Sequence, residues 1–343
     1  MKVWIDFSTA PDPLFFEPII RRLIEQGHTV RLTARDYSET VHIAESCGRP
    51  VEVVGRHGGA SMRGKAAAIL TRARQLSAWL KGREIDLALG YNSYAQALAA
   101  LATGVPLATC MDYEYQPANH LAFRIARRII VPEGYERSIL RKQGGTAAKV
   151  VVHEGLKEHV TLVDFEPDPR FPATLASLGV SESDILVTMR PPATQSAYHR
   201  FENHLFEQAV LRMADQPRTK VILLPRYQAQ AQQYRALARS NLLIPEVVLD
   251  GLNLVYWSDA VISAGGSMNR EAVVLGTQAA TVFAGRMGGV DRKLIADGSL
   301  QRIASLDDLD GLAPAAKRDR SRRPPVPTKA TEQVVQGLLG AVA

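Results

Sequence analysis

The residues whose types and spacing could do chemistry are densest between positions 259 and 277. Ala260–Ser263 is a short apolar run of the kind buried in a parallel sheet, and Gly265 and Gly266 interrupt it. Residues 268–275 have the pattern of a helix, and Gly276 suits its C-terminal end. A glycine loop between a strand and a helix N-terminus favours an anion, because free N–H groups and the helix dipole point at it. The alternative is an ordinary tight turn between strand and helix.

Glu271 lies about one turn inside this helix, where its carboxylate could accept hydrogen bonds from a ribose hydroxyl pair. A phosphate chain would then remain at the loop itself. The pattern therefore suggests a nucleotide site, and the competing interpretation of Glu271 is a plain surface glutamate. The loop residues that we expect at the diphosphate are Gly265, Gly266, Ser267, Met268 and Asn269.

Two arginines follow predicted strands in the same half of the chain. Arg190 precedes Pro191 and Pro192, and Arg226 follows Leu224 and Pro225. Because the carboxyl ends of parallel strands meet at one sheet edge, both guanidinium groups are expected near the glycine loop. There they could neutralise a diphosphate and stabilise a departing nucleotide. A salt-bridged surface arginine is the alternative for each.

The first half of the chain offers four candidates for acid–base chemistry. Asp12 follows the first predicted strand, His57 follows the third, and Asp112 and Glu114 follow a later one. A carboxylate whose pKa is raised in a cleft, or an imidazole, could serve as a general base. Each also has a structural alternative, since Asp12 precedes a proline in a turn and His57 stands alone.

Residues 59–66 resemble a phosphate-binding Walker A loop but fail one requirement. Ala66 stands where that motif needs Ser or Thr to hold Mg²⁺. Cys47 and Cys110 form no metal motif and no disulfide framework. We therefore expect no ATP site, no metal and no cofactor.

Strands and helices alternate along the whole chain, which predicts an α/β fold with mostly parallel sheets. The proline-rich stretch 164–172 marks a boundary. We expect a Rossmann-like domain over 1–160, a second over 173–312, and a basic, proline-rich, mobile connector with a C-terminal helix over 313–343. The predicted strands are residues 2–7, 30–33, 51–54, 86–89, 107–111, 129–131, 149–152, 185–189, 220–224, 246–249 and 260–263.

Several segments together resemble a known family. Gly265, Gly266, Glu271 and Gly276 are similar to the donor-nucleotide loop of GT-B glycosyltransferases and of the UDP-N-acetylglucosamine 2-epimerases built on the same fold. More narrowly, the chain resembles the DUF354 family. The residues that carry this resemblance lie in segments 4–6, 14–16, 27–28, 33–36, 55–59, 154–158, 164–168, 190–192, 224–226 and 250–251.

The resemblance implies two doubly wound domains facing across a cleft, with the nucleotide sugar on the second and an acceptor on the first. It favours a metal-independent glycosyltransferase that takes a nucleotide sugar, most simply a UDP-sugar, as substrate. Asp12 stands where many relatives carry a histidine, which weakens that reading. The alternatives are a UDP-sugar 2-epimerase and a nucleotide-sugar-binding protein without catalysis. The sugar or lipid-linked acceptor is open.

Composition narrows the partners. At 343 residues, with 46% hydrophobic and 22% charged residues, the chain is typical of a globular protein of two domains. The net charge is +6, yet basic and aromatic residues do not interleave, so no nucleic acid is expected. No leader or membrane span is evident, which favours a cytoplasmic protein. The apolar and basic segment 121–128 suits either peripheral contact with an anionic membrane or an ordinary helix with one solvated face.

Overall fold

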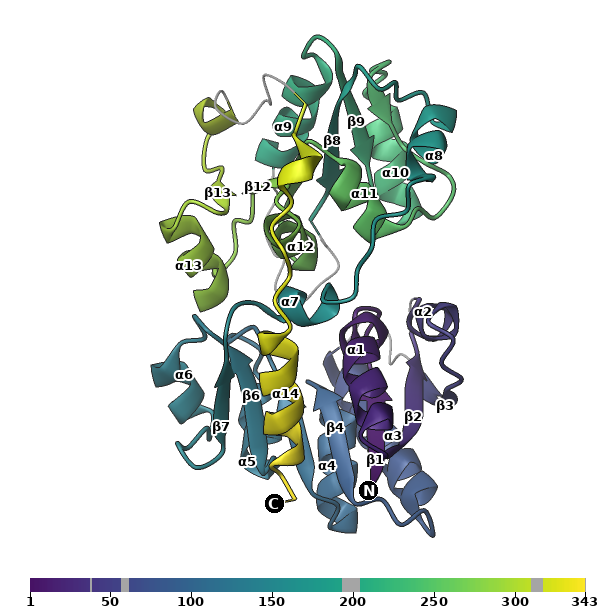
Figure 1. The fold of residues 1–343 in the computed structure, drawn as a ribbon, viewed down its shortest axis with the longest axis vertical. Coiled ribbons are helices and arrows are strands. Elements are labelled where there is room, and N and C mark those ends of the chain that lie inside the picture. The colour runs from purple at the N-terminus through teal and green to yellow at the C-terminus, as the bar shows by residue number, and fades with distance from the viewer. Residues whose placement is uncertain (38, 57–61, 193–203, 310–316, 343) are drawn as a thin grey trace. The chain divides into compact units, whose positions relative to one another are not determined.

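The computed structural model describes residues 1–37, 39–56, 62–192, 204–309 and 317–342. The chain divides into two compact units (Figure 1). Unit 1 comprises residues 1–164, 288–290 and 327–343, and unit 2 comprises residues 165–287 and 291–326. In the described residues, no helix is long and apolar enough to cross a membrane.

Unit 1 is built on a parallel sheet, whose described strands run in the order β3-β2-β1-β4-β5-β6-β7. Its strands are β1 (Lys2–Phe7), β2 (Thr29–Asp36), β3 (Glu52–Arg56), β4 (Leu87–Tyr91), β5 (Leu107–Cys110), β6 (Arg128–Pro132) and β7 (Val150–His153). Its helices are α1 (Asp12–Glu25), α2 (Thr40–Ser46), α3 (Met62–Leu80), α4 (Tyr94–Thr103), α5 (Asn119–Ile125), α6 (Arg137–Lys142), α7 (Lys157–Thr161) and α14 (Lys329–Leu339).

Alternation along β1 supplies both cores of this unit. Val3, Ile5 and Phe7 enter one cluster with α1 and α14, whereas Trp4 enters the other with α3, α4 and α5. A strand covered on both faces is apolar in its covered part, as residues 3–7 of β1 are apart from Asp6. The order reverses between β1 and β4, so the carboxyl ends of these two strands form the switch point where ligands collect in such sheets.

Unit 2 holds a second parallel sheet, with described strands in the order β10-β9-β8-β11-β12-β13. Its switch point lies between β8 and β11. Its strands are β8 (Ile185–Arg190), β9 (Thr219–Leu223), β10 (Leu242–Leu243), β11 (Ala260–Ser263), β12 (Gln278–Thr281) and β13 (Gln301–Arg302). Its helices are α8 (Phe171–Ser177), α9 (His204–Ala214), α10 (Gln228–Arg235), α11 (Gly251–Trp257), α12 (Ser267–Val274), most of α13 (Gly289–Ala296), and the 3₁₀ turns η1 (Asp307–Leu309) and η2 (Arg320–Arg322).

The prediction of two doubly wound, Rossmann-like α/β domains is confirmed by these two sheets. One predicted strand, residues 246–249, is wrong. The edge strand is instead Leu242–Leu243, paired with β9, and the Val247 and Val248 side chains are 64% and 82% exposed. An apolar run predicts a buried strand only when a partner covers it, and here none of the described residues does.

The described part of the predicted connector, residues 317–326, makes side-chain contacts with unit 2. Arg318, Arg320 and Arg323 stack on Tyr256, Trp257 and Phe165, with each guanidinium carbon 5.3 Å from a ring centroid. The buried Asp259 carboxylate accepts from the Arg318 backbone N–H at 2.9 Å and from the Arg320 guanidinium at 3.2 Å. The basic residues therefore attach this segment to unit 2.

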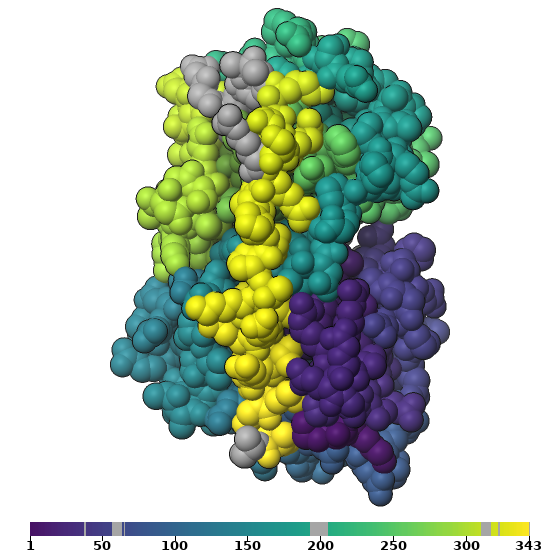
Figure 2. Space-filling view, in the orientation of Figure 1, coloured from purple at the N-terminus to yellow at the C-terminus, as the bar shows by residue number. Residues whose placement is uncertain are grey.

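After this segment the chain returns to unit 1 as α14. Val334 and Leu338 are fully buried in the same cluster as α1. Figures 1 and 2 show α14 lying beside α1. The last helix thus completes the core that the first strand begins.

Candidate functional site

The glycine loop of unit 2 leaves β11 at Ser263 and enters α12 at Ser267. Gly265 and Gly266 have φ of +96° and +107°, which side chains other than hydrogen rarely tolerate. A methyl group on Gly265 would lie 3.0 Å from the Phe283 ring, whereas one on Gly266 would meet nothing within 4 Å. Gly266 caps the helix without any side-chain hydrogen bond. Among the described residues, no side chain therefore caps the N-terminus of α12.

Arg190 stands beside this loop. Its Cα pairs in register with Ser263, and its carbonyl accepts from the Ala264 N–H at 3.2 Å. The Nε atom of Arg190 is buried without a hydrogen-bond partner, and the guanidinium forms no ion pair with any described residue. A buried donor on a cation is costly to leave unpaired, so this guanidinium is suited to an anion that none of the described residues supplies.

Arg226 lies one strand further along, after β9. Its Nε donates to the Pro191 carbonyl at 3.0 Å, and its backbone N–H donates to Gln230 Oε1 at 2.9 Å. Gln230 Nε2 in turn donates to the Pro192 carbonyl at 2.9 Å. These bonds fix the two prolines after Arg190. The structure thus gives Arg226 a contact that holds the Arg190 segment in place.

The remaining predicted nucleotide residues lie on α12. Met268 and Asn269 are 5% and 2% exposed, so neither side chain is presented to a ligand at the loop. The Oδ1 atom of Asn269 is buried without a described partner. Glu271 is half-buried. Arg270, which the sequence did not single out, donates to Asp291 at 2.7 Å and anchors the helix from behind.

Because β8 lies between β9 and β11, these groups share the carboxyl edge of one sheet. They flank the β8–β11 switch point, the usual ligand position in a doubly wound fold. A diphosphate there would meet a helix N-terminus without a side-chain cap and an arginine whose Nε has no partner among the described residues. This is the site of the described molecule best suited to a phosphorylated ligand.

In unit 1, Asp12 begins α1 and is 2% exposed. Its Oδ2 accepts from the N–H groups of Ser8 and Thr9 at 2.7 and 2.9 Å, and its Oδ1 accepts from Thr9 Oγ1 at 2.6 Å. Burial outweighs these donors and raises the pKa of Asp12 to about 6. The carboxyl is thus poised near neutrality, although its hydrogen bonds are made within its own loop.

Asp112 follows β5 and forms an ion pair with Lys157, whose Nζ lies 3.1 Å from Oδ2. The same ammonium lies 5.1 Å from the Tyr91 ring centroid and 3.9 Å from a Glu158 carboxylate oxygen. Burial and then the charge of Asp112 hold the pKa of Tyr91 well above its ordinary value. This charged cluster lies at the carboxyl ends of β4 and β5. The sequence drew attention to Asp112 but missed Lys157, although residues 154–158 carried part of the family resemblance.

Glu114 is 1% exposed and its carboxylate binds backbone N–H groups of unit 1. It accepts from Glu136 at 2.9 Å and from Gly289, which belongs to the same unit, at 3.0 Å. Its own carbonyl accepts from Gln143 Nε2 at 2.6 Å. These bonds favour a structural role over that of a base. His57 lies outside the described residues.

A buried ion pair between Asp6 and Arg72 was not predicted from the sequence. Asp6, at 0% exposure, accepts two hydrogen bonds from Arg72 at 2.6 and 2.8 Å, one from Thr33 at 2.6 Å and one from Ser93 at 2.5 Å. These residues lie on β1, β2, α3 and the start of α4. The only signal was an acidic residue inside an otherwise apolar strand.

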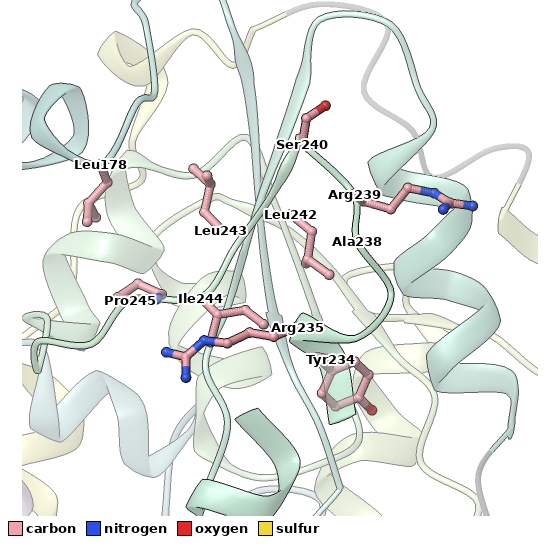
Figure 3. A pocket seen from close by; sticks show the side chains of 10 residues that line it. All are labelled: Leu178, Tyr234, Arg235, Ala238, Arg239, Ser240, Leu242, Leu243, Ile244 and Pro245. Carbon is pink, nitrogen blue, oxygen red and sulfur yellow. The ribbon is translucent and has the colours of Figure 1, made fainter. Parts of the chain in front are cut away.

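Figure 3 shows a groove of about 600 Å³ in unit 2 that lies elsewhere. It is bounded by the end of α10 and by β10, at the amino ends of the strands, so it is not the expected ligand position in a parallel sheet. Its lining residues are Leu178, Tyr234, Arg235, Ala238, Arg239, Ser240, Leu242, Leu243, Ile244 and Pro245.

A family model described as "Protein of unknown function (DUF354)" matches residues 1–323. An uncharacterized protein of Methanocaldococcus jannaschii is 26% identical over 299 residues, which cover 86% of this chain and 85% of that protein.

Solved structures of the GT-B fold match nearly the whole chain. The UDP-GlcNAc 2-epimerase of Neisseria meningitidis, bound to UDP-GlcNAc, has a TM-score of 0.75 at 14% identity and covers 99% of this chain and 100% of its own. The UDP-GlcNAc 2-epimerase of Methanocaldococcus jannaschii, in complex with UDP-GlcNAc and UDP, gives 0.73 at 15%, with 99% of both chains covered. The glycotransferase of kitacinnamycin gives 0.58 at 12%, covering 100% of this chain and 96% of its own. These identities show the fold alone.

Proposed function

We propose that this chain, which belongs to the DUF354 family and has the GT-B fold, binds a nucleotide sugar at the glycine loop of unit 2. The observation that carries the proposal is the N-terminus of α12 without a side-chain cap, beside Arg190, whose buried Nε has no partner among the described residues. Backbone N–H groups of residues 266–269 would hold the diphosphate, and Arg190 would neutralise it. Glu271, half-buried one turn inside α12, would accept from the ribose hydroxyls.

The reaction that we propose first is glycosyl transfer without a metal. Arg190 would stabilise the charge that develops as the nucleotide leaves. Asp12, with its pKa near 6, is the candidate base that would take the proton of an acceptor hydroxyl. That role requires the acceptor to replace part of the hydrogen-bonding within the Ser8–Thr9 loop.

A second candidate reaction is 2-epimerisation of a UDP-sugar. The Asp112–Lys157 pair next to Tyr91 favours it, because elimination and re-addition require a proton acceptor and a proton donor, and this cluster of unit 1 holds both kinds of group. The neighbours bound to UDP-GlcNAc are epimerases, which supports the same ligand class for this chain.

The first experiment is a thermal-unfolding panel with UDP, GDP, CMP and dTDP and their sugars. A ligand at about 100 times its Kd should stabilise the wild type by roughly 2.7 kcal/mol. We expect one nucleotide to do so, and the effect to be lost in Arg190→Gln and Glu271→Ala. Arg235→Gln is the matched control, since Arg235 is an exposed arginine of the same unit paired with Glu246.

If no nucleotide stabilises the wild type, or if Arg190→Gln responds as the wild type does, the proposal is wrong. If a nucleotide sugar does stabilise the wild type, the protein is next incubated with that sugar alone. Formation of the 2-epimer without any acceptor supports epimerisation, and an unchanged sugar excludes it, so that release of the nucleotide on addition of an acceptor then distinguishes transfer from binding alone.

A further inference from the structure

Arg35, near the carboxyl end of β2 in unit 1, is a second arginine that forms no ion pair with any described residue. Its Nη2 donates to the Ser8 carbonyl at 2.7 Å, and its guanidinium stacks on Tyr37 at 4.5 Å from the ring centroid. Its Nε atom is buried without a hydrogen-bond partner, and it forms no ion pair with any described residue. The Nε–H group is therefore removed from water without a hydrogen-bond partner among the described residues.

The charged groups near Arg35 explain why it forms no ion pair with any described residue. Arg72, Asp6 and Asp12 are the charged neighbours, and Tyr37 is the remaining titratable one. Both carboxylate oxygens of Asp6 are bound by Arg72 in a fork at 2.6 and 2.8 Å. Asp12 is bound by Ser8 and Thr9. Both acids are thus engaged by other donors.

The surroundings also make the cation unfavourable as it stands. Burial, and then the positive charge of Arg72, lower the pKa of Arg35 below its ordinary value. A buried guanidinium N–H without a partner is costly, and an oxygen atom of an anionic ligand would supply that partner. The position fits a ligand, since β2 is the neighbour of β1 and its carboxyl end borders the unit 1 switch point.

We infer that Arg35 binds an anionic oxygen group, a phosphate or a carboxylate, on the ligand of unit 1. The planar guanidinium would offer Nε and one Nη to two oxygens of that group, with the other Nη on the Ser8 carbonyl. This inference relies on the proposed function only in identifying that ligand as the acceptor. It then selects acceptors that carry a negative charge over neutral sugars.

The test follows the Nε–Hε resonance of Arg35 by NMR on the full chain, identified as the signal that disappears in Arg35→Lys. Inorganic phosphate and acetate are added separately at constant ionic strength. We expect the Arg35 signal to shift in a saturable way with at least one of them. A response to phosphate alone identifies a phosphate site, a response to acetate alone identifies a carboxylate site, and a response to both leaves the anion site itself supported.

Variants and a reference signal test whether the shift belongs to an anion bound at Arg35. In Arg190→Lys the Arg35 shift must persist, because the unit 2 loop is a separate anion site. The signal of Arg31, an exposed arginine at the other end of the same strand, must stay unshifted. Arg35→Met should weaken binding of the responding anion at this position roughly tenfold. Absence of any shift, or its loss in Arg190→Lys, overturns the inference whether or not unit 2 binds a nucleotide.

Thermal unfolding without ligand gives a second, independent readout. Arg35→Met should melt at or above the wild-type temperature, because it removes an uncompensated charge. Arg72→Met should melt well below it, because it strands the buried Asp6. If both variants lose stability alike, Arg35 is a structural residue and the inference is wrong.

Discussion

The Asp12 carboxyl combines a raised pKa with a full set of hydrogen bonds from its own loop. Four hydrogen-bond donors from Ser8 and Thr9 surround its carboxyl, yet burial still raises its pKa from 3.8 to about 6. Between these two values the folded protein binds more protons at this position than the unfolded chain does. The free energy of unfolding should therefore fall as the pH rises from about 4 to about 6.

Asp12→Asn tests this at the residue scale. At roughly 1.4 kcal/mol per pKa unit, the wild type should lose about 3 kcal/mol across that window from this group alone. The variant, which cannot ionise, should show a flatter profile. Urea unfolding of both proteins at pH 4, 5, 6 and 7 measures the difference. Parallel profiles would mean that the pKa of Asp12 is ordinary in the folded state.

Single residues also mark what a sequence can reveal. The glycine pair, Arg190 and Asp12 were visible, because glycine, arginine and aspartate after predicted strands follow general rules of parallel sheets. The Asp6–Arg72 pair was not, since the partners lie 66 residues apart and nothing in either segment names the other. The ion pair between Lys157 and Asp112 could not be predicted for the same reason. Arg35 could not be singled out either, because the burial of its Nε without a described partner is visible only in the structure.

At the scale of elements, the Gly265–Gly266 turn is the feature on which the proposed function depends. Gly266 has φ +107° and ψ −178°, a conformation found almost only in glycine. Gly266→Ala should therefore cost about 1–3 kcal/mol of stability. Because the added methyl group would occupy the open space before α12, it should also abolish the stabilisation by a nucleotide.

Gly298→Ala is the control for this change. Gly298 belongs to the same unit, has φ +80° and has equally open surroundings. It should lose stability through its backbone while keeping the nucleotide effect, as measured by thermal unfolding with and without the ligand. If the nucleotide stabilises Gly266→Ala and Gly298→Ala equally, the loop is not the phosphate site.

Elements were predicted well where burial and pattern agree, and poorly where tertiary contacts decide. The alternating strands of both sheets follow from apolar runs at regular spacing. Residues 246–249 have the same apolar character but lie exposed beyond the edge strand, and the basic connector is held by aromatic side chains far away in the sequence. Neither the exposure of residues 246–249 nor the contacts of the connector can be predicted from the local sequence.

At the scale of the molecule, the C-terminal helix makes the stability of unit 1 depend on the end of the chain. Leu338 is fully buried in the core formed with α1 and β1. Leu338→Ala should cost about 2–5 kcal/mol, the usual range for a buried leucine. Because the change lies in unit 1, a nucleotide bound to unit 2 should still stabilise that unit.

Leu339→Ala is the matched control, since Leu339 belongs to the same helix and is only partly buried. It should cost clearly less than Leu338→Ala. Urea unfolding followed by tryptophan fluorescence serves for both, because Trp4 and Trp79 report on unit 1 and Trp257 on unit 2. Equal losses in the two variants would show that α14 is not a part of the unit 1 core.

The return of the chain to unit 1 has a consequence for biosynthesis. A nascent chain emerges from the ribosome N-terminus first, and domains usually fold in that order. Here residues 1–164 remain without α14 until residues 327–342 have been made, whereas unit 2 is complete at residue 326. The unit begun first is therefore finished last. Until then its α14-binding face, which includes Ile130 of β6 and Val151 of β7 beside Gly337, remains uncovered during translation.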